Sequence, residues 1–449
     1  MKKRAVTPKI PAPQLVTLVF VILIVVGTEL LMLPAVTYSG QGVPFIDALF
    51  TATSAICVTG LSTFTIAEQY NIWGQAVLLV LIEIGGIGFM SLPVFFYILA
   101  KKRVHLSTRM ILRESLNLDR MSGEVQLAWY IIRIAFLIQL SGMCLLALDF
   151  VPRFGWTKGL WFSVFHAVSA FCNAGFDLFG NSLVSFQENP FVLGVISILI
   201  IAGGLGFLVW FDVLQSHAKR WSLHTRLALI AVGTLLVVGG LGFVLTEMNS
   251  DLVTSKSVVA RFFHYFFLAV TPRTAGFYSI DYATMSQAGL MLTMILMYIG
   301  GTSGSTAGGL KTTTLAVLVI KIRSLLRGRS RAEVFGRTIK ESAVSRAFTL
   351  FFFTFTLCVL AIFCLSVTER MPGISDGLSY IAFEVFSAFG TVGLSMGLTP
   401  HLSVFGKLVV ISLMFVGRVG ILTVAFSLLS KANKREVGYK YPDETVMIG

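Results

Sequence analysis

Four short segments of the sequence place a glycine in the same frame, directly after two uncharged residues. These glycine loops, numbered first to fourth, are residues 57–61, 172–176, 273–277 and 390–394, with the shared glycines Gly60, Gly175, Gly276 and Gly393. Ten residues before each glycine stands a phenylalanine, in the order Phe50, Phe165, Phe266 and Phe383. A register kept at four sites predicts four copies of one structural unit. Four copies of a loop can surround one axis, and an axis lined by backbone carbonyls can select dehydrated cations.

The chemistry expected at the glycine loops is ion coordination by main-chain oxygen. One position before the glycines stand Thr59, Ala174, Ala275 and Val392, and two positions before stand Val58, Asn173, Thr274 and Thr391. These side chains are uncharged, so selectivity for a monovalent cation is expected to come from the carbonyl groups. The loops carry no ring of carboxylates, which argues against a calcium filter. These eight residues and the four glycines form the candidate selectivity filter, and no other metal site or cofactor is expected.

Each glycine loop needs a helix that ends inside the membrane. Segments 45–56, 159–171, 258–270 and 376–388 precede the loops and are shorter than the roughly 20 apolar residues that cross a bilayer. They are also too apolar for ordinary loops, so re-entrant helices are expected. The carbonyl end of a helix carries about half a negative charge. Four such ends that converge would stabilise a cation.

Eight longer apolar stretches flank these short segments. They cover residues 14–36, 72–99, 126–150, 190–214, 224–246, 286–320, 346–368 and 403–429. The repeated unit is then span, re-entrant helix, glycine loop, span, and the units cover residues 1–120, 121–220, 221–343 and 344–449. The expected fold is an all-α membrane protein in which four parallel repeats, with eight transmembrane helices and four pore helices, surround a central pore.

Composition and the placement of charge agree with this topology. Of the 449 residues, 55% are hydrophobic and 13% are charged, whereas soluble domains carry about 25% charged residues. The net charge of +13 would suit a nucleic-acid partner in a soluble chain. Here 25 of the 35 lysines and arginines fall in five clusters, at residues 1–9, 101–120, 219–226, 321–346 and 431–440. The positive-inside rule places these clusters and both termini of a multi-pass protein in the cytoplasm.

The sixth apolar stretch is interrupted by a run rich in glycine. The run, called the 300–311 loop, consists of Gly300, Gly301, Thr302, Ser303, Gly304, Ser305, Thr306, Ala307, Gly308, Gly309, Leu310 and Lys311. So many glycines disfavour a straight helix, and a break in one unit only predicts a mobile gate below the filter. A packing break without gating is the plain alternative. A phosphate-binding loop needs lysine directly after its second glycine, and here Leu310 intervenes.

Arg418 is an isolated charge in the eighth apolar stretch. An arginine at mid-bilayer costs about 2.5–3.5 kcal/mol on insertion scales, so its side chain should face a pore or pair with carbonyls. Its register matches Gly86, Gly204 and Gly301 in the other second spans. Arg418 is therefore expected at the level of the gate, as a barrier to cations, a packing partner of the broken helix, or both.

Asp177, just past Gly175, either draws cations to the outer mouth or is an ordinary solvated carboxylate.

The four glycine loops and the eight stretches resemble the superfamily of potassium transporters that includes the bacterial Trk and Ktr systems and the plant high-affinity transporters. The similarity runs over nearly the whole chain and is greatest to the membrane component of Ktr systems, which has no two-helix N-terminal extension. In that superfamily, glycine in the first loop distinguishes potassium from sodium transport, so Gly60 implies potassium. The resemblance also implies a homodimer in the bacterial plasma membrane, with a cytoplasmic ring of nucleotide-binding regulatory subunits.

The function expected is potassium uptake through a gated filter, as the ion-translocating subunit of a Ktr-type system. The alternative is a sodium- or proton-coupled cation symporter with alternating access, a class marked by inverted repeats and acidic residues at the midplane. Here all units run parallel and no glycine loop contains an acidic residue before its glycine. An enzyme is not expected, because the six histidines are scattered along the chain. The sequence leaves open a sodium dependence and the mode of flux.

Overall fold

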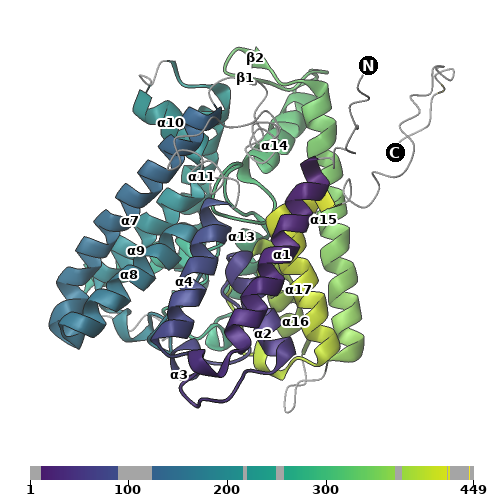
Figure 1. The fold of residues 1–449 in the computed structure, drawn as a ribbon. Helices are drawn as coiled ribbons and strands as arrows, with labels where there is room; N and C mark the ends of the chain where they lie inside the picture. Colours follow the sequence, from purple (N-terminus) through teal and green to yellow (C-terminus); the bar gives the residue numbers. More distant parts are fainter. Residues whose placement is uncertain are drawn as a thin grey trace, which may run out of the picture.

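The computed structural model describes residues 12–88, 124–215, 220–248, 257–369, 377–421, 423–424 and 444. The basic clusters at residues 1–9, 101–120 and 431–440 lie outside these ranges. So do the last parts of the stretches 72–99 and 403–429. Figure 1 shows helices packed side by side in one bundle, with β1 and β2 at one end and α3 at the other.

Four helices are long and apolar enough to cross a membrane in the described part of the chain. They are α1 (Ala12–Met32), α7 (Glu124–Phe154), α11 (Leu223–Thr246) and α15 (Glu341–Thr368). Large apolar side chains on them are exposed, including Leu148 at 68%, Leu245 at 76% and Phe363 at 68%. Soluble proteins rarely expose so much contiguous apolar surface. The outer faces of these helices therefore suit contact with lipid.

A short apolar helix follows each long helix, at the positions that the sequence predicts. These are α2 (Phe45–Ile56), α8 (Trp156–Cys172), α12 (Val258–Val270) and α16 (Gly377–Gly390). Nearly every side chain in the second half of α2 is buried, as are most in the second halves of the other three. The ends of the short helices thus lie in the interior of the bundle.

A third set of helices follows the short ones. It consists of α4 (Ile72–Ile87), α9 (Pro190–Gly204) with α10 (Phe207–Gln215), α13 (Gln287–Tyr298) with α14 (Thr312–Leu326), and α17 (Val404–Val419). The smaller elements are η1 (Pro34–Val36), α3 (Ile66–Gln69), η2 (Val184–Phe186), η4 (Tyr282–Thr284), η5 (Thr399–His401) and the hairpin of β1 (Glu333–Val334) and β2 (Arg337–Thr338).

Contacts between these helices form a closed cycle. Helix α4 packs on α8, α9 on α12, α13 on α16, and α17 on α2. Each helix of the third set thereby reaches the next short helix along the chain, and the last one returns to the first. The closing contact includes an ion pair at 2.7 Å between the Lys407 ammonium of α17 and the Asp47 carboxylate of α2.

The sequence predicts a break in one helix of the third set, but the structure has breaks in others too. Helices α9 and α10 are bent by 93° at Leu205 and Gly206. Helix α4 ends at Gly88 and α17 at Gly420, and the φ angles of Gly88, Gly206 and Gly420 are 87°, 92° and 90°. A residue in this left-handed region cannot continue a right-handed helix, and only glycine adopts it without strain. The expectation of a break in one unit only is therefore wrong.

The N-cap residues of α4, α9, α13 and α17 also bind the end of the preceding long helix or the segment just after it. The pairs are Asn71 with Ala35, Asn189 with Asp149, Ser286 with Glu247 and Ser403 with Glu369. In the last pair, the Glu369 carboxylate accepts bonds from the backbone N–H and the hydroxyl of Ser403, at 2.9 and 2.6 Å. Such caps satisfy donors that a helix start leaves open and fix the spacing of two helices.

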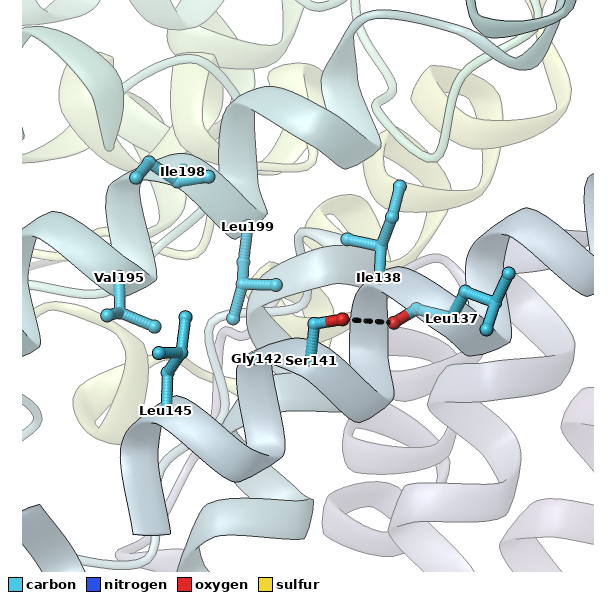
Figure 2. A pocket seen from close by; sticks show the side chains of 8 residues that line it. All are labelled: Leu137, Ile138, Ser141, Gly142, Leu145, Val195, Ile198 and Leu199. Carbon is cyan, nitrogen blue, oxygen red and sulfur yellow. Dashed lines mark hydrogen bonds between the residues drawn. The ribbon is translucent and has the colours of Figure 1, made fainter. Parts of the chain in front are cut away.

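A shallow pocket on the outer surface lies between α7 and α9 (Figure 2). Its volume is about 220 Å³, and it is lined by Leu137, Ile138, Ser141, Gly142, Leu145, Val195, Ile198 and Leu199. The Ser141 hydroxyl donates to the Leu137 carbonyl at 2.8 Å within the same helix. Its polarity is thus satisfied internally, and the pocket presents an apolar surface, as a face toward lipid tails requires.

Replacing Glu369 by alanine is expected to destabilise the protein by about 1–3 kcal/mol, because two partly buried donors of Ser403 lose their acceptor. The measurement is the thermal unfolding midpoint of the purified protein in detergent. Glu188→Ala is the matched control, since Glu188 is exposed in a loop. Equal midpoints for the two variants would contradict the role assigned to Glu369.

Candidate functional site

The structure brings the four glycine loops together in a closed ring. In this ring the carbonyl oxygen before one glycine lies against the glycine of a neighbouring loop. The contacts join Ala174 O to Gly60, Ala275 O to Gly175, Val392 O to Gly276 and Thr59 O to Gly393. A methyl group added to Gly60 would lie 2.5 Å from the Ala174 oxygen, and one added to Gly175 would lie 2.7 Å from the Ala275 oxygen. Any side chain at these positions would displace a carbonyl of the ring.

All four loops share an unusual backbone conformation. The residue two positions before each glycine is left-handed, with φ between 50° and 71° at Val58, Asn173, Thr274 and Thr391. The glycines are left-handed too, with φ between 69° and 97°. For a residue other than glycine this conformation costs about 1–2 kcal/mol. The surrounding contacts must therefore impose one loop shape four times.

Backbone N–H groups of the loops bond back to the short helices. The bonds run from Thr59 to Ser54 O at 2.8 Å, from Ala174 to Ser169 O at 2.7 Å, from Ala275 to Thr271 O at 3.0 Å and from Val392 to Ser387 O at 2.8 Å. These donors point away from the ring, whereas the carbonyls of the same residues lie in it. Four carbonyl oxygens at one level can replace part of the hydration shell of an alkali cation.

Hydroxyl groups on the short helices brace the loops, and the sequence reasoning missed them. Ser54 accepts from the Gly60 N–H at 3.0 Å, and Ser387 accepts from the Gly393 N–H at 3.1 Å. Ser169 instead donates to the Phe176 carbonyl at 2.8 Å. In the third loop, Thr271 donates to the Phe277 carbonyl. The signal for these hydroxyls in the sequence was a serine six positions before three of the four glycines.

The second and third loops are also joined through their side chains. Asn173 and Thr274 lie 3.1 Å apart between the amide and the hydroxyl, and both residues are buried.

The short helices α2, α8, α12 and α16 end at the ring, so their carbonyl ends meet there. The partial negative charges of these ends favour a cation beside the ring.

The 300–311 loop joins α13 to α14 and lies against the ends of the short helices. The Thr306 hydroxyl donates to the Phe171 carbonyl at 3.2 Å. A methyl group added to Gly308 would come within 2.8 Å of the Thr391 methyl carbon, and Gly309 lies close to Gly390. Phe171, Gly390 and Thr391 form the base of the second and fourth loops. The 300–311 loop therefore sits directly beside the ring.

Hydrogen bonds hold the 300–311 loop in one conformation. Within it, the N–H of Gly300 donates to Leu310 O at 2.8 Å, and the Lys311 ammonium donates to Ala307 O at 2.6 Å. Bonds to helices α9 and α10 run from Thr302 N–H to Gly204 O at 3.0 Å, from Thr306 N–H to Gly203 O at 3.3 Å and from Phe207 N–H to Gly304 O at 2.9 Å. Gly301 lies beside Gly204 and Ala307, Ser303 O lies near Gly206, and Ser305 accepts from the Ala307 N–H.

Arg418 ties this loop to two helices. Its guanidinium donates to the carbonyls of Thr306 in the loop and of Gly85 and Gly86 in α4, the last at 3.1 Å. The arginine therefore pairs with carbonyls, as its cost in an apolar region demands. Of the four matching positions, Arg418 thus contacts Gly86, and Gly301 contacts Gly204.

A cavity of about 880 Å³ opens on the other side of the ring. Its lining includes the four ring glycines and the carboxylates of Glu68, Asp177 and Asp281, and none of its described lining residues is lysine or arginine. Asp177 is not an ordinary solvated carboxylate, because its Oδ1 accepts from the N–H groups of Phe179 and Gly180 at 2.8 and 2.7 Å. Burial raises the pKa of Asp177, and the bonds from Gly180 and Phe179 oppose that rise. The acidic lining raises the local concentration of cations.

The chain matches known proteins over nearly its full length. The TrkH family, described as cation transport protein, matches residues 3–435. The potassium/sodium uptake protein NtpJ of Enterococcus hirae is 57% identical, over 100% of this chain and 99% of that protein. The Ktr system potassium uptake protein B of Bacillus subtilis is 40% identical, over 97% of this chain and 96% of that protein.

A solved structure shares the fold. The potassium transporter TrkH from Vibrio parahaemolyticus superposes with a TM-score of 0.72 at 18% identity, over 97% of this chain and 87% of that chain. At that identity the likeness speaks for the mostly helical architecture. The family match over most of the sequence is independent of it, and this chain therefore belongs to the TrkH family of cation transport proteins.

Proposed function

We propose that this chain is the ion-translocating subunit of a Ktr-type potassium uptake system. The observation that carries the proposal is the closed ring of carbonyl oxygens from Thr59, Ala174, Ala275 and Val392, each packed on a glycine of a neighbouring loop. Relatives at 40% and 57% identity are named for potassium uptake and for potassium/sodium uptake. Resemblance to the superfamily supports potassium as the preferred ion, because glycine occupies position 60.

In the proposed mechanism, the backbone carbonyl oxygens of the ring replace the water molecules that surround a cation. A cation that enters the acidic cavity sheds water as the carbonyls of the four loops coordinate it. The Val58, Asn173, Thr274 and Thr391 layer, one residue deeper in each loop, is proposed as part of the same filter. The carbonyl ends of the short helices offset the loss of bulk water on the inner side.

The proposed topology follows from this pore. Four units, at residues 1–120, 121–220, 221–343 and 344–449, each contribute one long helix, one pore helix and one second span, which gives eight spans in all. The cycle of helix contacts supports a common axis for the four units. Both termini then lie in the cytoplasm of a bacterial cell, and the acidic cavity faces outside.

The 300–311 loop and Arg418 are proposed as the gate in its closed state. The loop sits on the inner side of the ring, and the guanidinium bonds clamp it to α4. A cation passing this level meets a fixed positive charge, so opening requires these bonds to break and the loop to withdraw. The names of the Ktr relatives support assembly with further subunits of a Ktr system. The resemblance to the superfamily implies that these form a cytoplasmic nucleotide-binding ring and that this chain is a homodimer. A sodium requirement is a further expectation for the complete system.

The proposal is tested by reconstituting the purified chain in liposomes with potassium and sodium gradients set independently. Passive, saturable potassium flux down its own gradient is expected. Flux that needs an inward sodium or proton gradient would instead indicate a coupled symporter. A chain that moves neither cation in any gradient, even with the proposed gate loosened by Arg418→Gln, would contradict the proposal.

Gly60→Ser is expected to lower the preference for potassium over sodium by about tenfold, which corresponds to about 1.4 kcal/mol. The added side chain strains a backbone with φ of 97° and pushes the Ala174 carbonyl out of the ring. The measurement is the ratio of potassium to sodium flux in liposomes. Gly40→Ser is the control, because Gly40 has φ of 67° in open space. An unchanged ratio in the Gly60 variant would remove the filter assignment.

Ser54→Ala is expected to reduce the same flux ratio several-fold while the protein still folds. Its hydroxyl accepts from the Gly60 N–H, and an unpaired buried N–H costs about 1–3 kcal/mol. The control is Ser141→Ala, whose hydroxyl bonds only within α7 at the lipid-facing pocket. If both variants keep the wild-type ratio, the hydroxyl does not shape the filter.

Arg418→Gln is expected to raise basal potassium flux several-fold in the absence of any regulatory subunit, since it removes a positive charge and loosens the 300–311 loop. Rubidium uptake at equal protein per vesicle measures the effect. Arg153→Gln serves as the control, because that arginine is half exposed and paired with Asp149 at the far end of α7. Equal uptake by wild type and the Arg418 variant would leave this arginine a packing role only.

A further inference from the structure

The end of α14, its connection to α15 and the start of α15 carry a dense positive charge. Residues 321–346, named here the basic segment, contain eight lysines and arginines and two glutamates. Among the described residues, the glutamates pair with Lys321 at 3.1 Å and with Arg329 at 3.0 Å. The six basic residues of the segment outside these pairs are exposed: Arg323, Arg327, Arg331, Arg337, Lys340 and Arg346. Their charge is presented to the surroundings.

The basic segment is folded. Strands β1 and β2 pair antiparallel through a tight turn at Phe335 and Gly336, whose φ angles are 49° and 70°. The N–H of Ile339 donates to Ala332 O at 2.8 Å, and Ala332 is fully buried. These contacts hold the charges on a fixed platform at the end of α14, beside α15 (Figure 1).

Exposed apolar side chains stand among the charges. Leu325 and Leu326, in the last turn of α14, are 54% and 84% exposed, and Phe335 at the hairpin tip is 51% exposed. Basic residues interleaved with such apolar groups are typical of surfaces that lie in a membrane interface. The positive-inside rule explains the sign of the charge, but it does not require a folded hairpin with an exposed aromatic tip.

The depth of α14 places this surface at the headgroups. The helix begins beside the 300–311 loop, which is bonded to Arg418 and which we place with that arginine near mid-bilayer. From Lys311 to Lys321 a helix rises about 15 Å, which equals half of the roughly 30 Å hydrocarbon core. Leu326 and the hairpin then lie beyond the hydrocarbon, at the level of lipid phosphates.

We propose that the basic segment binds anionic lipid headgroups of the cytoplasmic leaflet, with Phe335 and Leu326 inserted at the interface. Arginine guanidinium groups bind phosphate in a bidentate manner. Clusters of basic residues next to a membrane helix attract anionic lipids, and each charge adds to the affinity. The proposal rests on the cytoplasmic orientation given under the proposed function, and it commits to lipid in preference to an acidic face of a regulatory protein.

The first experiment places a fluorescent reporter at the hairpin tip. Phe335→Trp protein is reconstituted in vesicles of brominated phosphatidylcholine, with or without phosphatidylglycerol. The Phe335→Trp protein is expected to show more quenching of tryptophan fluorescence than the parent protein. This difference is expected to be larger in the mixed vesicles and to fall at high salt, which screens surface charge. Equal quenching in both kinds of vesicle would overturn the proposal.

The second experiment measures lipid affinity directly by native mass spectrometry with phosphatidylglycerol. The triple variant Arg331→Gln, Arg337→Gln and Lys340→Gln is expected to bind roughly tenfold or more weakly. The matched control is Lys158→Gln with Arg261→Gln, which removes exposed charges outside the basic segment. Wild-type affinity in the triple variant would overturn the proposal and leave an acidic protein face as the partner. Neither readout depends on flux, so failure here is distinguishable from failure of the filter assignment.

Discussion

The structure depends on the close approach of a carbonyl oxygen of one glycine loop to the glycine of the next. Each contact fixes two loops at once, and four contacts close the ring. A single added methyl group at Gly60 or Gly175 would break the closure locally. Three features maintain this distance between neighbouring loops. They are the left-handed residues, the N–H bonds to the short helices and the serine hydroxyls. The cycle of helix contacts around the ring repeats this closed arrangement among the surrounding helices.

The region on the inner side of the ring has the opposite requirement. A filter must keep its shape, whereas a gate must change it. The 300–311 loop, as the proposed gate, can change its shape because its bonds are mostly to backbone carbonyls that can be exchanged one for another. Arg418 makes three bonds to backbone carbonyls with one side chain, one to the loop and two to α4. In the proposed gate, the charge that would obstruct the path is therefore also the group whose release would free the loop.

The local sequence was sufficient to predict the helices but not the breaks within them. The segments 45–56 and 258–270 coincide with α2 and α12, because apolar runs of that length end at clear turn signals. The meeting of the glycine loops also follows from their shared register. The breaks at Gly88 and Gly206 did not follow, because a glycine within an apolar run does not reveal whether its φ is positive. The hydroxyl of Ser54 escaped notice because its partner is set by tertiary contact.

The closing contact of the helix cycle has a consequence for biogenesis. Helix α17, near the end of the chain, packs on α2 near its start, and Lys407 pairs with Asp47 across this seam. All the helices up to α17 must therefore be synthesised before the cycle of helix contacts can close. The proposed conduit therefore acquires its full wall only after α17 has been inserted beside α2.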